Sequence, residues 1–253
     1  MSDMNRFDGF AATQLVVAHV RGLIERGQLR SGDRLPAERE LALRLGVSRA
    51  SLRAGLRSLA AMGVVQTRHG SGSFITSGRP VLATDALSFL AALHGFTPAQ
   101  MFEARLVLEV SVAGLAAERA NSDHLVVISD EATGMFASLD DPQAFLLHDA
   151  LFHRAVALAS GNPILSALVN MVSELFREQR RQTIGRASDL KESAEEHRAI
   201  YQAIRAHDPE RARRMMNDHL QRAEHAQVIE ETRSGEAAVE ESPEVMPEAA
   251  VKS

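Results

Sequence analysis

The chain has 253 residues, no cysteine, no tryptophan and a formal net charge of −5. The lack of cysteine excludes a disulfide scaffold, a cysteine zinc finger and a thiol nucleophile. No apolar run approaches the ~18 residues of a membrane helix, and the polar N-terminal segment does not have the pattern of a signal peptide. We therefore expect a cytoplasmic protein with no membrane partner.

The charge is unevenly distributed along the chain. Residues 1–79 carry twelve arginines against six acidic residues, a net of +6, and residues 80–229 carry fourteen basic against twenty acidic residues, a net of −6. Residues 230–253 carry two basic and seven acidic residues, a net of −5. We expect three parts with these boundaries: a basic first domain with its linker, a second domain, and an acidic tail that is disordered because it is rich in Glu, Ala and Pro.

The basic first part has the pattern of three short helices followed by a β-hairpin. The apolar period and the glycines that follow it predict helices over 11–26, 37–45 and 49–62. Two β-prone runs, 64–67 and 73–76, flank a glycine-rich turn. This order predicts a winged helix-turn-helix, with a linker at 77–80.

The third of these helices carries an arginine stripe beside an apolar stripe. Arg49, Arg53 and Arg57 are spaced by four residues, so the leucines can pack inward while the arginines remain free. In helix-turn-helix proteins the start of this helix enters the major groove, where arginine binds guanine. An isolated arginine stripe is more often a solvated face, but the cap, the wing and the basic charge together favour double-stranded DNA as the partner.

The candidate DNA-contact residues are Arg39 on the preceding helix, Ser48, Arg49, Ser51 and Arg53 at the start of the third helix, and His69 and Gly70 at the tip of the wing. A small glycine-rich tip can enter a minor groove or follow a phosphate backbone.

Three stretches of this first part, 35–42, 45–53 and 63–74, resemble the winged-helix domain of GntR-type bacterial transcription regulators. The resemblance implies a homodimer on a palindromic operator, with base contacts from the three arginines at 39, 49 and 53 and a minor-groove contact from His69. One departure is Ala54-Gly55, where the family usually has Glu-Ala. Glycine weakens a helix interior by ~1 kcal/mol relative to alanine, which puts some rigidity of this helix in doubt.

From residue 84 onward the pattern is helical throughout. We expect helices near 84–94, 98–119, 123–138, 142–160, 163–183, 189–206 and 209–229. Four of them begin with a capping side chain followed by proline: Thr97-Pro98, Asp141-Pro142, Asn162-Pro163 and Asp208-Pro209. The loops are short, which predicts antiparallel packing. The fold class is therefore mainly α, with a winged helix-turn-helix before an all-α antiparallel helical bundle.

Four side chains of the second part are candidate metal ligands. Asp149 and His153 are four residues apart and leave the same face of one helix, while His197 and His219 lie among apolar residues on two later helices. An aspartate and three histidines on three helices can form a metal site in a bundle. The spacing of Asp149 and His153 alone is more typical of an ordinary surface pair.

The second part resembles the FCD ligand-binding domain of the FadR branch of the GntR family. Metal-binding FCD domains carry Asp-x-x-x-His, then a His, then a His 22 residues on, and the four candidates fit this pattern. The resemblance implies a metal ion, and imidazole and carboxylate ligands suit a divalent one, Zn²⁺ first, with Ni²⁺, Mn²⁺ and Fe²⁺ as alternatives. It counts against an acyl-CoA ligand, because the members of the branch that bind acyl-CoA lack the metal site.

Arg105 lies in an otherwise apolar helix and therefore needs a partner. The resemblance implies that an arginine at this motif grips the carboxylate of an effector, while a salt bridge to a neighbouring helix and a solvated position are the alternatives. Asn170, between two apolar residues, is a second candidate for hydrogen bonding to the effector. The expected effector is a small carboxylic or sugar acid.

Three functions remain open. The first is a ligand-responsive, DNA-binding repressor whose second domain binds the metal ion and the acid. The second is a metal-dependent enzyme acting on a small acid, because an open His₃Asp site can activate water, although no nucleophile with a paired general base is evident. The third is a regulator whose metal is purely structural. We expect the first of these, and therefore no enzymatic activity.

Overall fold

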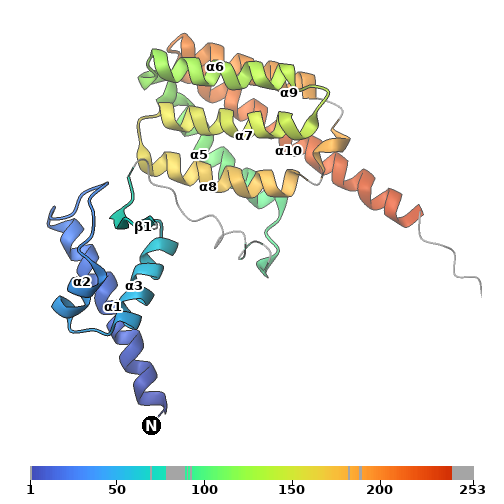
Figure 1. The fold of residues 1–253 in the computed structure, drawn as a ribbon. Helices are drawn as coiled ribbons and strands as arrows, with labels where there is room; N and C mark the ends of the chain where they lie inside the picture. The colour runs from blue at the N-terminus through green and yellow to red at the C-terminus, as the bar shows by residue number, and fades with distance from the viewer. Residues whose placement is uncertain are drawn as a thin grey trace, which may run out of the picture. The chain divides into compact units, whose positions relative to one another are not determined.

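The computed structural model describes residues 2–68, 70–77, 89, 91, 93–181, 183–187 and 190–240. The chain forms two compact units, Met1–Leu87 and Ser88–Ser253, and their division falls in the undescribed stretch around the linker that we expected. Each unit is a separate body with its own apolar core (Figure 1). Within the described residues, no helix combines the length and the apolar character needed to cross a membrane.

The first unit is the winged helix-turn-helix that the sequence predicts. Its elements are α1 (Ser2–Glu25), α2 (Glu38–Leu45), α3 (Arg49–Ala61), β1 (Val65–Arg68) and β2 (Gly72–Ile75). The two strands are antiparallel, with Val65 opposite Ile75 and Arg68 opposite Gly72. The difference from expectation is at the start, because α1 begins at Ser2 rather than at residue 11.

The helix ends of this unit follow from capping chemistry. Ser48 precedes α3, and its side chain accepts a hydrogen bond from the Ser51 backbone N–H at 3.0 Å, as an N-cap does. Gly46 ends α2 in the left-handed conformation, with φ 64°, which costs glycine no steric strain. These two caps fix the short turn that orients α3 against α2.

Gly55 is the point of closest approach between α1 and α3. A Cβ atom at this position would lie 2.6 Å from the Cβ of Val16 and 3.1 Å from the backbone oxygen of Thr13. Val16 is fully buried in the core of this unit. The glycine therefore allows the two helices to pack closely, and this contact offsets its poor helix propensity.

The second unit is a bundle of helices. Its elements are α5 (Pro98–Arg119), α6 (Ser122–Ala137), α7 (Pro142–Ala159), α8 (Pro163–Arg180), the 3-10 turn η1 (Ile184–Arg186), α9 (Leu190–Arg205) and α10 (Pro209–Glu240). Helix α7 packs between α6 and α8, and α5 packs against α7, α8 and α10 (Figure 1). All four expected caps form, because the side chains of Thr97, Asp141 and Asn162 accept backbone N–H groups and Asp208 accepts from the N–H of Arg211.

The structure differs from expectation at the ends of two helices in this unit. Helix α8 ends at Arg180 rather than at 183, and η1 follows it. Helix α10 continues to Glu240, past the boundary at 229, because Glu and Ala are strong helix formers and the next proline is Pro243. The expected helix at 84–94 falls mainly outside the described residues, as does the last part of the tail, 241–253.

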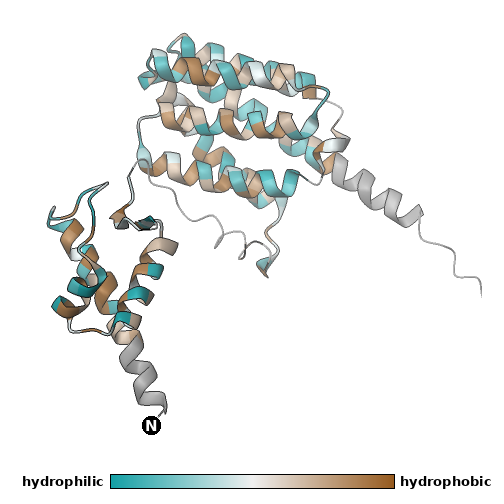
Figure 2. Cartoon of the chain, in the orientation of Figure 1, coloured by the Kyte–Doolittle hydropathy of each residue, from teal (hydrophilic) through white to brown (hydrophobic). Residues whose placement is uncertain are grey.

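Small residues dominate the core of the bundle. The alanines of this buried core are Ala113, Ala116, Ala117 and Ala120 on or just after α5, Ala132 on α6, Ala155, Ala157 and Ala159 on α7, Ala194 and Ala203 on α9, and Ala212 on α10. Apolar and polar stretches alternate along each helix, as expected for helices packed on one side (Figure 2). Short side chains let helix axes approach, and this brings inward polar groups of different helices within reach of one another.

We predict that Gly55→Ala destabilises the first unit by about 1–3 kcal/mol, because the new methyl group overpacks the contact with Val16. Thermal unfolding of the full chain, with hydrogen exchange of the α3 amides to isolate the first unit, measures this change. Gly22→Ala is the matched control, because a Cβ atom there would meet only the flexible guanidinium of Arg26 and alanine gains up to ~1 kcal/mol in a helix. If both variants stabilise the unit, the close contact at Gly55 has no energetic role.

Candidate metal centre and DNA-binding surface

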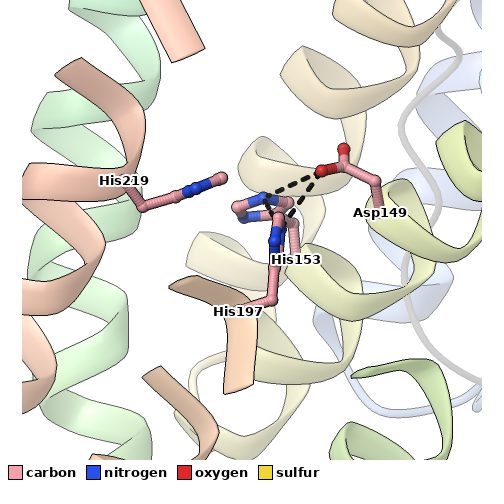
Figure 3. A group of neighbouring side chains, drawn as sticks. All are labelled: Asp149, His153, His197 and His219. Carbon is pink, nitrogen blue, oxygen red and sulfur yellow. Dashed lines mark hydrogen bonds and ion pairs between the residues drawn. The ribbon is translucent and has the colours of Figure 1, made fainter. Parts of the chain in front are cut away.

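Four side chains from three helices converge in the core of the bundle. Asp149 and His153 come from α7, His197 from α9 and His219 from α10, and one ligand atom of each lies within 4.8 Å of those of the others. Figure 3 shows the side chains directed toward one another, with Asp149 joined to His153 and His197. The three histidines are almost completely buried. The convergence that spacing alone does not reveal is therefore present in the structure.

The closest contacts within this cluster join the Nε2 atoms and the carboxylate. His197 Nε2 lies 3.1 Å from Asp149 Oδ1 and 3.3 Å from His153 Nε2, and His153 Nε2 lies 3.8 Å from the same carboxylate oxygen. Zn²⁺ binds nitrogen and oxygen ligands at about 2.0–2.2 Å, so two ligands of one ion are separated by up to about twice that length. The separations among Asp149, His153 and His197 therefore fit ligands of a single ion.

Each histidine uses its other ring nitrogen to bind a group outside the cluster. His153 Nδ1 pairs with the Glu109 carboxylate, His219 Nδ1 lies 2.8 Å from Glu196 Oε2, and His197 Nδ1 lies 2.7 Å from the backbone oxygen of Ser193. A carbonyl oxygen only accepts, so Nδ1 of His197 carries a proton. Metal-binding histidines typically have this arrangement, because it holds the ring and leaves Nε2 for the ion.

The electrostatics of the cluster favour the metal-binding forms of Asp149 and His219. Burial raises the pKa of Asp149, but the hydrogen bond from His197 and the charges of His153, His197 and Arg105 outweigh this and hold the pKa well below its ordinary range. Burial, followed by the nearby charges of His197 and His153, lowers the pKa of His219. An ionised carboxylate and a neutral imidazole are the forms that bind metal ions. A cation among these ligand atoms would also reduce the repulsion between them.

A cavity of about 240 Å³ adjoins the cluster. Asp149 and His219 line it, together with Arg105 of α5. Arg105 is almost fully buried; its Nε donates to Glu109 Oε1 at 2.7 Å, and its guanidinium lies 4.3 Å from the ring centre of Phe176. The partner that this arginine needs is therefore on its own helix, one turn later, rather than on a neighbouring helix.

Glu109 joins Arg105 to the metal cluster, because one carboxylate oxygen binds the arginine and the other pairs with His153. Burial raises the pKa of Glu109, but the charges of Arg105 and His153 outweigh burial and lower it to about 2. On the other side, Glu196 binds both His219 and Arg222. Sequence reasoning missed both glutamates, although Glu109 follows Arg105 at the i, i+4 spacing of a helical ion pair.

Asn170 does not join the cavity. It is half-buried on α8 and is not among the residues that line this space, to which α8 contributes Phe176 and Arg180. Six residues separate Asn170 from Phe176, which turns the helix by about 240° at 3.6 residues per turn. The apolar neighbours of Asn170 therefore do not indicate the face that meets the cavity.

The candidate DNA-contact residues that the structure describes are exposed, apart from the half-buried Ser51. Arg39 and Arg49 are exposed at the starts of α2 and α3, and Gly70 is exposed with φ 72°. Arg53 is also exposed, and its Nε donates to Glu38 Oε2 at 2.8 Å. Ser48 and Ser51 hydrogen-bond with each other at the start of α3. His69 lies outside the described residues.

We predict that Glu109→Gln weakens Zn²⁺ binding by about 10–100-fold, the usual cost of changing a group that supports a metal-binding histidine. Competition with a chromophoric chelator measures the affinity. Glu103→Gln, on the exposed face of the same helix, is the matched control and should bind Zn²⁺ like the unsubstituted chain. Equal affinity in both variants would show that Glu109 does not support the cluster.

The metal-free chain should lose stability as the pH falls below about 6.5, the pKa of histidine in an unfolded chain. The folded-state pKa of His219 is lower than this, so the unfolded chain binds the additional proton and the free energy of unfolding falls by about 1 kcal/mol per pH unit. Denaturant unfolding between pH 7.5 and 5.5 tests this. His219→Gln should flatten the dependence, and an unchanged slope in this variant would contradict the assignment.

Comparisons with known proteins agree with both units. Residues 12–75 match the model for bacterial regulatory proteins of the gntR family, and residues 100–222 match that of the FCD domain. The transcriptional regulator LutR of Bacillus subtilis is 32% identical over 207 residues, covering 80% of this chain and 94% of its own. The transcriptional repressor NanR of Klebsiella aerogenes is 33% identical, covering 82% of each chain.

A solved structure described as Streptococcus agalactiae GntR has a TM-score of 0.61 and 28% identity, and the match covers 85% of this chain and 99% of that one. These relatives are transcription regulators rather than enzymes, which removes the metalloenzyme from the open functions. The chain belongs to the GntR family and is a DNA-binding transcription regulator with an FCD domain of the FadR-like branch.

Proposed function

We propose that this regulator is a repressor controlled by a small carboxylic or sugar acid, which binds in the cavity beside a divalent metal ion. The main support for this proposal is that Asp149 and His219 of the metal cluster line the same cavity as Arg105. Asp149, His153, His197 and His219 would hold the ion, Zn²⁺ first, with Ni²⁺, Mn²⁺ and Fe²⁺ as alternatives. Three imidazoles and one carboxylate leave positions that a ligand carboxylate or hydroxyl can fill.

The size of the cavity supports a small effector. Its volume of about 240 Å³ is below the ~300–1,000 Å³ of sites for drug-sized ligands. Arg105 uses Nε for Glu109, and its Nη atoms form no hydrogen bond with another described residue. These Nη atoms are the donors that an effector carboxylate would meet, and arginine suits such planar pairing.

We further propose that the protein acts as a homodimer on a palindromic operator. A two-fold symmetric dimer places two recognition helices in successive major grooves, so the operator reflects the symmetry of the protein. Arg39, Arg49 and Arg53 would contact bases, with Ser48 and Ser51 at the start of the helix and His69 and Gly70 on the wing. The NanR relative is named as a transcriptional repressor, which supports repression. Effector binding would shift the population of conformations able to match both half-sites.

The alternative is a purely structural metal, with the effector bound elsewhere. The adjacency of Arg105 to the metal cluster favours a shared site, because Glu109 occupies only the Nε of this arginine and the same cavity is lined by Asp149 and His219. The two alternatives differ in what a chelator does. A structural ion stabilises the fold without affecting the effector, whereas an ion in the effector site is needed for the response.

We predict that Arg105→Lys still binds DNA but needs at least about ten times more effector to be released from it. Lysine keeps a positive charge beside Glu109 and lacks the planar donor pair that grips a carboxylate. A thermal-shift screen of hydroxy, keto and sugar acids with the Zn²⁺-loaded chain identifies the acid. Release of a selected DNA duplex is then titrated with this acid, with Arg205→Lys, exposed on α9, as the control.

Removal of the metal with a chelator should abolish the effector response and lower the melting temperature. A chelated protein that melts earlier but still releases DNA at the same acid concentration would establish the structural alternative. An undiminished response of Arg105→Lys would instead place the effector away from this cavity.

A further inference from the structure

The wing has an additional backbone partner on the side of β2 opposite β1. The segment before α2 runs along β2, where Leu35 N–H donates to Ser73 O at 2.9 Å and Ile75 N–H donates to Asp33 O at 2.8 Å. Arg34 and Phe74 face each other in this bridge. The β1–β2 ladder on the other edge places Arg68 opposite Gly72. Strand β2 is therefore paired along both of its edges, and each neighbouring segment supplies an arginine.

The two arginines flank one aromatic ring. Side chains alternate along a strand, so Gly72 and Phe74 face the same side of the wing as their cross-strand partners Arg68 and Arg34. The guanidinium carbon of Arg68 lies 4.9 Å from the centre of the Phe74 ring, and that of Arg34 lies 5.9 Å from it. Arginine is attracted to an aromatic face at such distances, so the ring restricts both guanidinium groups.

Gly72 provides the space for this arrangement. A Cβ atom at this position would lie 3.3 Å from Arg34 Nε and 3.4 Å from Arg34 Nη2. The guanidinium of Arg34 thus passes over a residue without a side chain, and it remains exposed on the wing.

Neither arginine is neutralised within the described residues. Arg44 and Arg53 of the same unit each form an ion pair with a glutamate, whereas neither Arg34 nor Arg68 is within ion-pair distance of a described carboxylate. Two like charges on one ring repel each other unless an anion binds between or beside them. The arrangement therefore has the chemistry of an anion site.

A hollow of about 490 Å³ lies beside the wing, and it is lined by Arg34 and Arg68 as well as by Arg53 of α3. The acidic residue of the lining, Glu38, is already paired with Arg53. A duplex whose bases are contacted by α3 brings its sugar–phosphate backbone past the side of this helix. The family of the chain makes duplex DNA the anion that reaches this hollow.

We propose that Arg34 and Arg68 form a phosphate clamp on the wing, which binds the DNA backbone and contributes affinity that does not depend on sequence. Phosphate contacts position a protein on DNA and carry no direct sequence information, whereas base contacts specify the site. The clamp therefore complements the arginines of α3. It acts on any duplex and releases counterions when it binds, so its contribution depends on salt.

The test uses the full-length chain and two DNA duplexes of equal length, one selected by the unsubstituted protein from a random pool and one scrambled. Arg34→Gln with Arg68→Gln should weaken binding to both duplexes by a similar factor, about tenfold or more, the cost of losing charged hydrogen bonds. The plot of log affinity against log salt should become shallower, its slope decreasing in magnitude by about 0.9 for each arginine removed. Arg49→Gln should instead weaken the selected duplex more than the scrambled one.

Two controls keep the result interpretable. Arg205→Gln with Arg211→Gln removes the same two charges at exposed positions of the second unit and should leave both affinities and the salt slope unchanged. The double lysine variant retains both charges and should restore most of the slope, which a misfolded wing would not do. An unchanged slope in the double glutamine variant overturns the clamp, and so does a loss confined to the selected duplex, because that would indicate base readout.

Discussion

Three imidazoles and a carboxylate share a buried volume in the helical unit, and the surrounding hydrogen bonds must satisfy them. Burial of such groups is costly unless each is paired. Glu109, Ser193 and Glu196 provide the partners for the three Nδ1 atoms, one on α5 and two on α9. This requirement links α5, α7, α9 and α10 through polar contacts, and the alanine-rich core allows the helices to come close enough to make them.

The same contacts connect the metal cluster to the cavity. Glu109 binds Arg105 with one oxygen and pairs with His153 through the other. A ligand that binds Arg105 therefore also affects Glu109, which supports the cluster. On the opposite side Glu196 binds His219 and Arg222. By linkage, an acid that binds more tightly in the presence of the ion also makes the ion bind more tightly. The carboxylates of the buried Glu109 and the half-buried Glu196 give this coupling a short physical route.

Capping chemistry made most of the fold predictable from the sequence. A side-chain acceptor before proline marks the start of a helix directly, and the pairs at Thr97, Asp141, Asn162 and Asp208 all proved to be caps. Helix ends were less predictable: α10 extends to Glu240 because no proline or apolar boundary stops it earlier.

The candidate ligands were identified by a family pattern, since their convergence depends on how three helices pack. The glutamates were missed because their partners lie on other helices or are shared, and Asn170 was misplaced because local apolarity does not define which face meets a cavity.

X-ray absorption of the Zn²⁺-loaded full-length chain would observe the metal ligands themselves. We expect one ion per chain, with scattering from three imidazole rings and at least one oxygen ligand at about 2.0–2.2 Å. His153→Gln should lose one imidazole contribution while the helical unit remains folded. A zinc environment without imidazole, or one unaffected by that substitution, would contradict the metal centre on which the effector site depends.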